Sequence, residues 1–291
     1  MARFRRMAAG TPAGHLRIAV VGHVEHITIG RVPAVPRAGE IVHVDAPRWF
    51  PGGGGGVAFH QLVRSDAEVH LFTALGEDEA GDDTAAAIAR AGGRIHAVRR
   101  AGPHTRCVAM IDPAGERTIL VLGDPVQPRA EDPLPWDLLA RCDAVYFTAD
   151  DPAVLRLARM ARVLVATARR GPSIVAAGVR LDAVIGSAVD AREASTLADY
   201  PVAPDALVLT EGARGGRIES ASGTTQFAAP PSPPRIAGGA YGAGDSFAAA
   251  VTYFLAAGLD VLSACERAAP HGAAVLSGLD PRETQLPLAR P

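Results

Sequence analysis

The chain has 291 residues, of which 48% are hydrophobic and only 5% aromatic. This length allows one large domain or two modest ones, with Ala, Val and Leu supplying most of the core. The net charge of −2 argues against a general nucleic-acid or membrane-surface binder, so we expect neither partner.

The cysteines and the amino-terminal stretch bear on where the protein works. Cys107, Cys142 and Cys265 lie far apart and form no metal or redox spacing, which suits a reducing cytoplasm. No apolar run is long enough to span a bilayer. Glycine and proline interrupt residues 1–15 before any apolar core forms, so we expect a frayed leader there and not a signal peptide.

The first predicted strand covers residues 16–22 (LRIAVVG), an apolar run that ends in glycine. Residues 23–50 lack helical periodicity and are broken by prolines, and residues 40–45 alternate like a strand. This pattern predicts a small exposed β element outside the main core.

A run of glycines, Gly52 to Gly56, comes next and leads into a helix-like segment over residues 57–64. Such a run lets the backbone approach a ligand closely, and it is also typical of a flexible linker. A strand over residues 69–76 follows at once, which favours the ligand-binding interpretation because linkers more often separate units.

An acidic turn over residues 77–81 precedes a predicted helix over residues 82–91. Its carboxylates could bind a metal, but an acidic helix start is the commoner explanation. A strand over residues 95–98 and a β-hairpin over residues 105–122 follow.

Strands and helices alternate in the second half of the chain. This alternation predicts an α/β fold with a mainly parallel sheet covered on both faces. Ligands in such folds bind at the carboxyl ends of the strands, so we expect the glycine-rich loops to meet at one rim. The predicted elements are strands at 144–148, 163–167, 183–186 and 206–210, helices at 152–161, 191–197, 246–257 and 262–276, a loop with Arg169 and Arg170, and a hairpin at 217–227.

Residues 238–247 (GGAYGAGDSF) place small residues and one acid, Asp245, directly before a predicted helix. The unpaired N–H groups and the dipole of a helix start attract phosphate. A carboxylate beside an anion site indicates phosphoryl transfer, with Asp245 accepting a proton from an attacking hydroxyl. The alternative is a helix that Asp245 merely caps.

The sequence contains neither a P-loop nor a Gly-x-Gly-x-x-Gly dinucleotide turn after its first strand. It resembles instead the ribokinase family of sugar and nucleoside kinases, also called the PfkB type, over nearly its whole length. The matching motifs, in the order of the family, are Pro51 to Ala58 with Leu71 to Gly81, Asp190-Ala191-Arg192-Glu193 in place of Asn-x-x-Glu, Thr210 to Gly215, and Gly242 to Phe247.

The resemblance implies a three-layer α/β/α sandwich with a small β lid, forming a single kinase domain over residues 16–291. It implies that Asp245 is the general base. The N–H groups of Gly242, Ala243 and Gly244 would form an anion hole for the transferring phosphoryl group.

The resemblance also assigns the binding residues. ATP would lie at Thr210, Gly212 and Gly215, and Asp190 with Glu193 would orient Mg²⁺ through water. Gly52, Gly53 and Gly54 would approach the hydroxyls of a sugar or nucleoside acceptor. The β segments at about 23–50 and 105–122 would form the lid, which in this family often also mediates a homodimer.

The acceptor side departs from the family pattern. The Asp that commonly follows the first strand is absent from Gly22 to His26, and Glu25 is the candidate substitute, although an exposed Glu in a β loop is the alternative. The Asn that usually follows the glycines is also missing. We therefore expect an ATP-dependent cytoplasmic kinase whose acceptor is open. A catalytically inactive ligand-binding or regulatory protein with the same fold is the first rival, and a dehydrogenase is the second.

Overall fold

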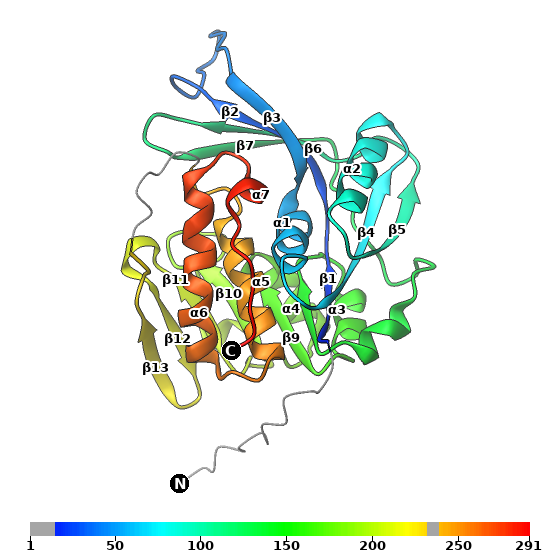
Figure 1. Cartoon of the computed structure of the whole chain (residues 1–291), viewed down its shortest axis with the longest axis vertical. Coiled ribbons are helices and arrows are strands. Elements are labelled where there is room, and N and C mark those ends of the chain that lie inside the picture. The colour runs from blue at the N-terminus through cyan, green and yellow to red at the C-terminus, as the bar shows by residue number, and fades with distance from the viewer. Residues whose placement is uncertain (1–14, 232–238) are drawn as a thin grey trace.

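The computed structural model describes residues 15–231 and 239–291, and a large sheet runs through its centre (Figure 1). Within these residues the sheet has nine strands, and neighbours run parallel except for the β11–β12 and β12–β13 pairs at one edge. In spatial order the strands are β13 (Gly223–Phe227), β12 (Gly216–Ser220), β11 (Leu207–Thr210), β10 (Ala183–Ser187), β9 (Val163–Thr167), β8 (Ala144–Phe147), β1 (Arg17–Val21), β4 (Glu68–Gly76) and β5 (Arg94–Arg100).

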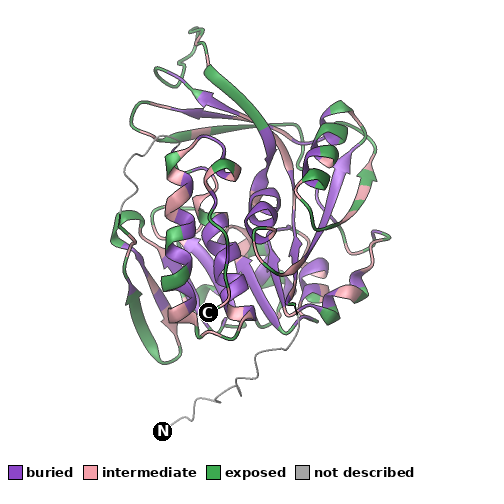
Figure 2. Ribbon diagram, viewed as in Figure 1, coloured by how far each residue is buried: buried purple, intermediate pink, exposed green. Residues whose placement is uncertain are grey.

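Both faces of this sheet are covered, as the continuous apolar strands predict. In β1, Ile18 and Val20 point into one core cluster, whereas Ala19 and Val21 point into the other. Figure 2 shows the central strands as buried. The first cluster is covered by α1 (Gly53–Leu62), α2 (Glu79–Arg90), α5 (Ala243–Ala256) and α6 (Val261–Ala274), and the second by α3 (Pro152–Ala158), α4 (Gly171–Ala177) and a 3-10 helix (Trp136–Arg141). The three-layer α/β/α prediction is confirmed.

A second, smaller sheet stands beyond one end of the large one (Figure 1). Its order is β3 (Asp45–Gly52), β2 (Glu25–Arg31), β6 (Arg106–Ile111) and β7 (Arg117–Leu122). β2 and β6 pair in parallel and the outer pairs are antiparallel. One face of this sheet packs Ile27, Phe50 and Cys107 against Val57 of α1 and against Tyr241. The two predicted β segments therefore come together and rest on the helix that begins in the glycine run.

Two predicted elements are wrong. Residues 191–197 form no helix; they make a turn followed by a separate 3-10 turn, Leu197–Asp199. The side chains of Asp190 and Glu193 take backbone N–H groups of Arg192 and Ser187, which replaces helical pairing. Residues 40–44 belong to no strand, and β3 begins only at Asp45.

Two helices that begin with glycine also differ from the prediction. α1 begins at Gly53, four residues before the predicted helix, although glycine is a poor helix former. A Cβ on Gly55 would lie 2.6 Å from the carbonyl oxygen of His23, so close packing requires glycine there. The short helix α4, which starts with Gly171 and Pro172, follows the loop with Arg169 and Arg170 and is not among the predicted elements.

Some predictions lie outside the described residues. They include residues 1–14 of the predicted leader and Gly238 of the glycine-rich motif. In the described ranges, no helix is both long and apolar enough to cross a membrane. A short α7 (Pro281–Thr284) packs beside α1 near the carboxyl end.

Candidate active site

Asp245 lies in the first turn of α5, where the sequence predicts the catalytic acid. Gly242 precedes the helix with a φ of +79°, a left-handed conformation that favours glycine. The N–H of Ala243 makes a long bond of 3.3 Å to the carbonyl of Ala240. A Cβ on Gly244 would meet nothing within 4 Å, so the helix start is open beside that residue. The carboxylate and the open helix start are thus adjacent.

The glycine run reaches the same place from the other side. A Cβ on Gly54 would lie 2.5 Å from Thr148 Oγ1 and 3.1 Å from Asp245 Oδ1. Any larger residue would push into the acid, because both contacts are closer than normal packing permits. The structure therefore brings together two motifs that are nearly 200 residues apart, at the amino-terminal ends of α1 and α5.

Tyr146 of β8 holds the acid. Its buried hydroxyl donates to Asp245 Oδ1 at 3.0 Å. Burial raises the pKa of Asp245 above its usual value, and the Tyr146 hydrogen bond together with the electrostatic effect of His23 and Arg117 only partly opposes this. A carboxylate with a raised pKa is a better proton acceptor than an ordinary aspartate. No sequence signal identifies Tyr146, because it lies in an apolar strand.

Glu25 belongs to the wall of this site. Its side chain is only 14% exposed, so the interpretation of an exposed loop glutamate is wrong. Glu25 Oε1 lies 3.4 Å from His23 Nε2, and a Cβ on Gly53 would lie 3.0 Å from both side chains. Burial tends to raise the pKa of Glu25, but hydrogen bonds from His23 and Cys107 bring it below its usual value. Glu25 is therefore an ionised acceptor of hydrogen bonds beside the glycines.

Arg170 and Tyr241 complete this wall. Arg170 Nε donates to the Thr148 carbonyl at 2.9 Å, and its Nη2 lies 3.3 Å from His23 Nδ1. The Tyr241 hydroxyl accepts a hydrogen bond from the N–H of Gly53 at 2.9 Å. A Cβ on Gly52 would lie 2.5 Å from that hydroxyl, so Gly52 also needs to be glycine. Arg170 was predicted only as a loop residue, although it follows the carboxyl end of β9.

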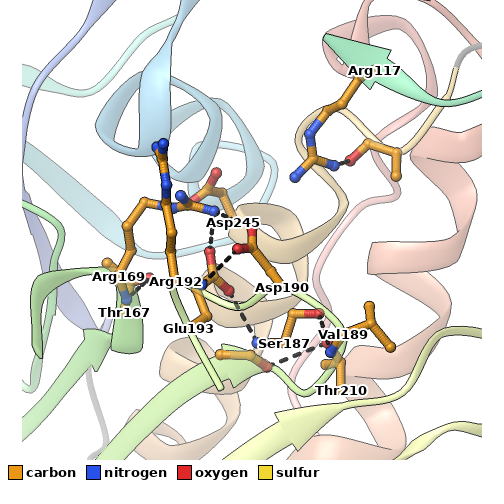
Figure 3. A network of polar contacts seen from close by, with 12 residues as sticks. Arg117, Thr167, Arg169, Ser187, Val189, Asp190, Arg192, Glu193, Thr210 and Asp245 are labelled. Atoms are coloured by element: carbon orange, nitrogen blue, oxygen red, sulfur yellow. Dashed lines mark hydrogen bonds and ion pairs between the residues drawn. The ribbon is translucent and has the colours of Figure 1, made fainter. Parts of the chain in front are cut away.

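The two predicted metal residues lie side by side, as Figure 3 shows. Arg169 Nη2 is 2.6 Å from Asp190 Oδ2 and 2.6 Å from Glu193 Oε1. Burial and the nearby negative charge of Asp245 raise the pKa of Glu193, despite the opposing effect of Arg169. The Asp190 pKa is lowered, first by the N–H of Arg192 and then by Arg169.

The surroundings of this pair do not suit a directly bound magnesium ion. In residues 15–231 and 239–291, no three His, Cys, Asp or Glu side chains are grouped so as to hold a metal. Both carboxylates of the pair are already bonded to one guanidinium. As they stand, Asp190 and Glu193 do not fit a metal bound directly by the protein, and the prediction that they orient Mg²⁺ through water stays a prediction. The acidic turn at 77–81 is a helix start, with Asp78 capping the N–H of Gly81 at 3.0 Å.

The predicted nucleotide loop lies next to this pair. Thr210 pairs with Ser187 at the ends of β11 and β10, and its hydroxyl donates to the Gly186 carbonyl at 3.3 Å. Gly212 and Gly215 have φ values of +61° and +88° in the tight turn that leads to β12. The turn explains both glycines, while their contact with ATP stays a prediction.

The chain is similar to a known protein family. The family model described as pfkB family carbohydrate kinase matches residues 15–203 and 181–287. No curated protein matches the chain.

Solved structures share its fold. Ribokinase from Thermotoga maritima is 16% identical, with a TM-score of 0.73 over 94% of this chain and 96% of that one. Arabidopsis thaliana ribokinase, solved with ribose and ATP, is 15% identical, with a TM-score of 0.72 and the same coverage of 94% and 96%. A nucleoside kinase from Methanocaldococcus jannaschii is 13% identical, with a TM-score of 0.70 over 94% and 95% of the two chains.

The family model spans almost all of the described chain, and its match includes both glycine-rich motifs that meet at Asp245. The chain therefore belongs to the pfkB family of carbohydrate kinases.

Proposed function

We propose that this protein transfers the γ-phosphoryl group of ATP to a hydroxyl group of a sugar or nucleoside, with Asp245 as the general base. The observation that carries the proposal is the position of the Asp245 carboxylate at the start of α5, bonded to Tyr146 and so near Gly54 that a Cβ there would lie 3.1 Å from it. Family membership supports sugar or nucleoside phosphotransfer in general, and this geometry supports the particular base.

In the proposed reaction, the acceptor hydroxyl attacks the γ-phosphorus. A new P–O bond forms to the acceptor, the bond between the β–γ bridging oxygen and the γ-phosphorus breaks, and ADP leaves. The hydroxyl proton passes to Asp245 late in the reaction, when the attacking oxygen already bonds to phosphorus. Tyr146 holds Oδ1 of the carboxylate, and Oδ2 would then take the proton of the acceptor. The N–H groups of Gly242, Ala243 and Gly244 would stabilise the charge on the transferring group.

The proposed binding residues fall into two groups, one for the acceptor and one for the nucleotide. Glu25 and the backbone of Gly52, Gly53 and Gly54 would hold the acceptor, since a buried, ionised carboxylate suits sugar hydroxyls. Thr210 with the loop over 212–215 would line the nucleotide. ATP would bring its Mg²⁺ on its own phosphates, where the metal neutralises charge when bound.

The small sheet would act as a lid within a single kinase domain over residues 16–291. Arg117 of β7 donates to the Ala240 carbonyl at 2.8 Å, directly before the start of α5, so the sheet already contacts the catalytic loop. β7 also leaves four consecutive apolar side chains exposed, Ile119 to Leu122. This strip supports a homodimer through the lid. We place the reaction in the cytoplasm, consistent with the buried, unpaired cysteines.

The test is incubation of the protein with ATP, Mg²⁺ and a panel of sugars and nucleosides, with mass spectrometry of the products. A phosphorylated acceptor formed by wild type, and lost in Asp245→Asn, supports the proposal. Binding of an acceptor without product in wild type would instead favour an inactive ligand-binding protein. The Asp245–Tyr146 pair argues against that rival, because a pure binder has no need for a carboxylate at this point.

A further inference from the structure

Arg169 joins two neighbouring strand ends at the rim of the site. It follows β9 directly, in a 3-10 turn (Ala168–Arg170), whereas Asp190 and Glu193 follow β10. A single nitrogen, Nη2, lies 2.6 Å from a carboxylate oxygen of each acid (Figure 3). Charge-assisted bonds of this length are among the strongest that side chains make.

All oxygens of the two carboxylates have protein partners. Asp190 Oδ1 accepts the N–H of Arg192 at 2.9 Å, and Glu193 Oε2 accepts the N–H of Ser187 at 3.0 Å. The remaining oxygens, Asp190 Oδ2 and Glu193 Oε1, take Arg169. The N–H of Arg169 in turn donates to Thr167 Oγ1 at 3.4 Å. Backbone N–H groups thereby hold both acids, and Thr167 holds the backbone of Arg169.

We propose that Arg169 is a fixed cation that takes the place of a protein-bound divalent ion at the Asp190–Glu193 pair. A guanidinium attached to the chain is already in place, whereas Mg²⁺ gives up its water reluctantly. To bind directly, a metal would have to displace an arginine whose side chain is only 36% exposed and leave it without its partners. Arg169 therefore keeps free metal off this pair, and metal enters the site with the nucleotide. This last consequence rests on the proposed function.

The cation and a metal would compete for the same two carboxylates, so the decisive experiment measures metal binding directly. Mn²⁺ serves as the probe, because carboxylates bind it and free Mn²⁺ is quantified by electron paramagnetic resonance. Nucleotide-free wild type is titrated beside Arg169→Gln, Arg169→Lys and the double variant Arg169→Gln/Glu193→Gln. Circular dichroism and thermal melting confirm that each variant is folded.

Removing the cation should expose the acids. We expect Arg169→Gln to bind one Mn²⁺ at least about tenfold more tightly than wild type, since two carboxylates lose their counterion. Arg169→Lys keeps a positive charge and should stay close to wild type. The double variant should lose the new site. The proposal is overturned if wild type already binds Mn²⁺ as tightly as Arg169→Gln does.

A second measurement decides the matter if Arg169→Gln does not fold. Wild type is then compared with Glu193→Gln and Asp190→Asn alone. Equal, weak Mn²⁺ binding by all three supports the proposal, whereas tight binding that either substitution abolishes refutes it. No arm contains ATP or an acceptor, so the result stands even if no product is found in the substrate panel, and failure of the kinase proposal is recognised separately.

Discussion

Replacing Tyr146 by phenylalanine should shift the pH dependence of the reaction without changing the fold. Tyr146 is 1% exposed, and its hydroxyl donates to Asp245 Oδ1 at 3.0 Å. This hydrogen bond favours the ionised carboxylate, so its loss lets burial raise the pKa of Asp245 further. Because the base works only when ionised, the acid limb of kcat/KM should move to higher pH.

The size of the shift follows from the bond. A hydrogen bond to a charged group is worth about 1.5–3 kcal/mol, and about 1.4 kcal/mol corresponds to one pKa unit. Part of the loss is recovered by water, so we expect an upward shift of about one unit. Well above the limb, kcat/KM should change only severalfold, since the carboxylate is then ionised in both proteins.

The assay is initial-rate kinetics between about pH 5 and 9, at saturating MgATP and low acceptor, with product counted by mass spectrometry so that no coupling enzyme limits the range. Tyr253→Phe is the matched control, since Tyr253 is equally buried and its hydroxyl donates to Asp66 Oδ1 at 2.8 Å. Its acid limb should not move. An unshifted limb in Tyr146→Phe, or an equal shift in the control, would refute the reasoning.

Further predictions concern the base, the glycine run, the acceptor and the lid. Asp245→Asn should lower turnover by about 10²-fold or more. Its melting temperature at pH 7 should equal or exceed that of wild type, because the raised pKa of Asp245 means that the ionised acid opposes folding above that pKa. This difference in melting temperature should vanish as pH falls toward 3.8. Gly54→Ala puts a Cβ 3.1 Å from the Asp245 carboxylate and should lower kcat at least about tenfold. The control Gly171→Ala, whose Cβ meets nothing within 4 Å, should stay active and gain a few tenths of a kcal/mol in free energy of unfolding. Equal activity of the two variants would contradict this prediction. Glu25→Gln should raise the KM of the acceptor about tenfold and leave the KM of ATP unchanged, and parallel changes in both would argue against an acceptor role. Val121→Asp should convert a dimer to a monomer in analytical ultracentrifugation, and a monomeric wild type would rule out the dimer.

The sequence predicted the sheet well because its strands are buried on both faces. β9 has the predicted bounds, Val163–Thr167, and β1 differs from its prediction by one residue at each end. Apolar runs between turn signals are local features, so they can be recognised without knowing the partners. The convergence of Gly54 on Asp245 was also expected, because loops of an α/β fold meet at one rim.

The parts that could not be predicted depend on contacts between distant segments. Tyr146 cannot be told from a core residue inside the run AVYF, and only the fold brings its hydroxyl to Asp245. The start of α1 at Gly53 contradicts helix propensity, and the reason is the close approach of other backbone. The predicted helix over 191–197 failed because side chains of Asp190 and Glu193 bond to nearby N–H groups, an alternative that residue patterns do not rank.

Two adjacent arginines distinguish this site from the family pattern, one on the acceptor side and one at the Asp190–Glu193 pair. Arg169 and Arg170 lie in one 3-10 turn after β9, where successive side chains diverge by about 120°. Arg169 turns to the acids Asp190 and Glu193, and Arg170 turns to His23, which pairs with Glu25. On the acceptor side, where the family's Asp is missing, the site thus has the cluster of Arg170, His23 and Glu25. On the nucleotide side, the acidic pair has Arg169 as its cation. A single turn therefore supplies one cation to each side of Asp245, so a change at either arginine should be felt on its own side and not on the other.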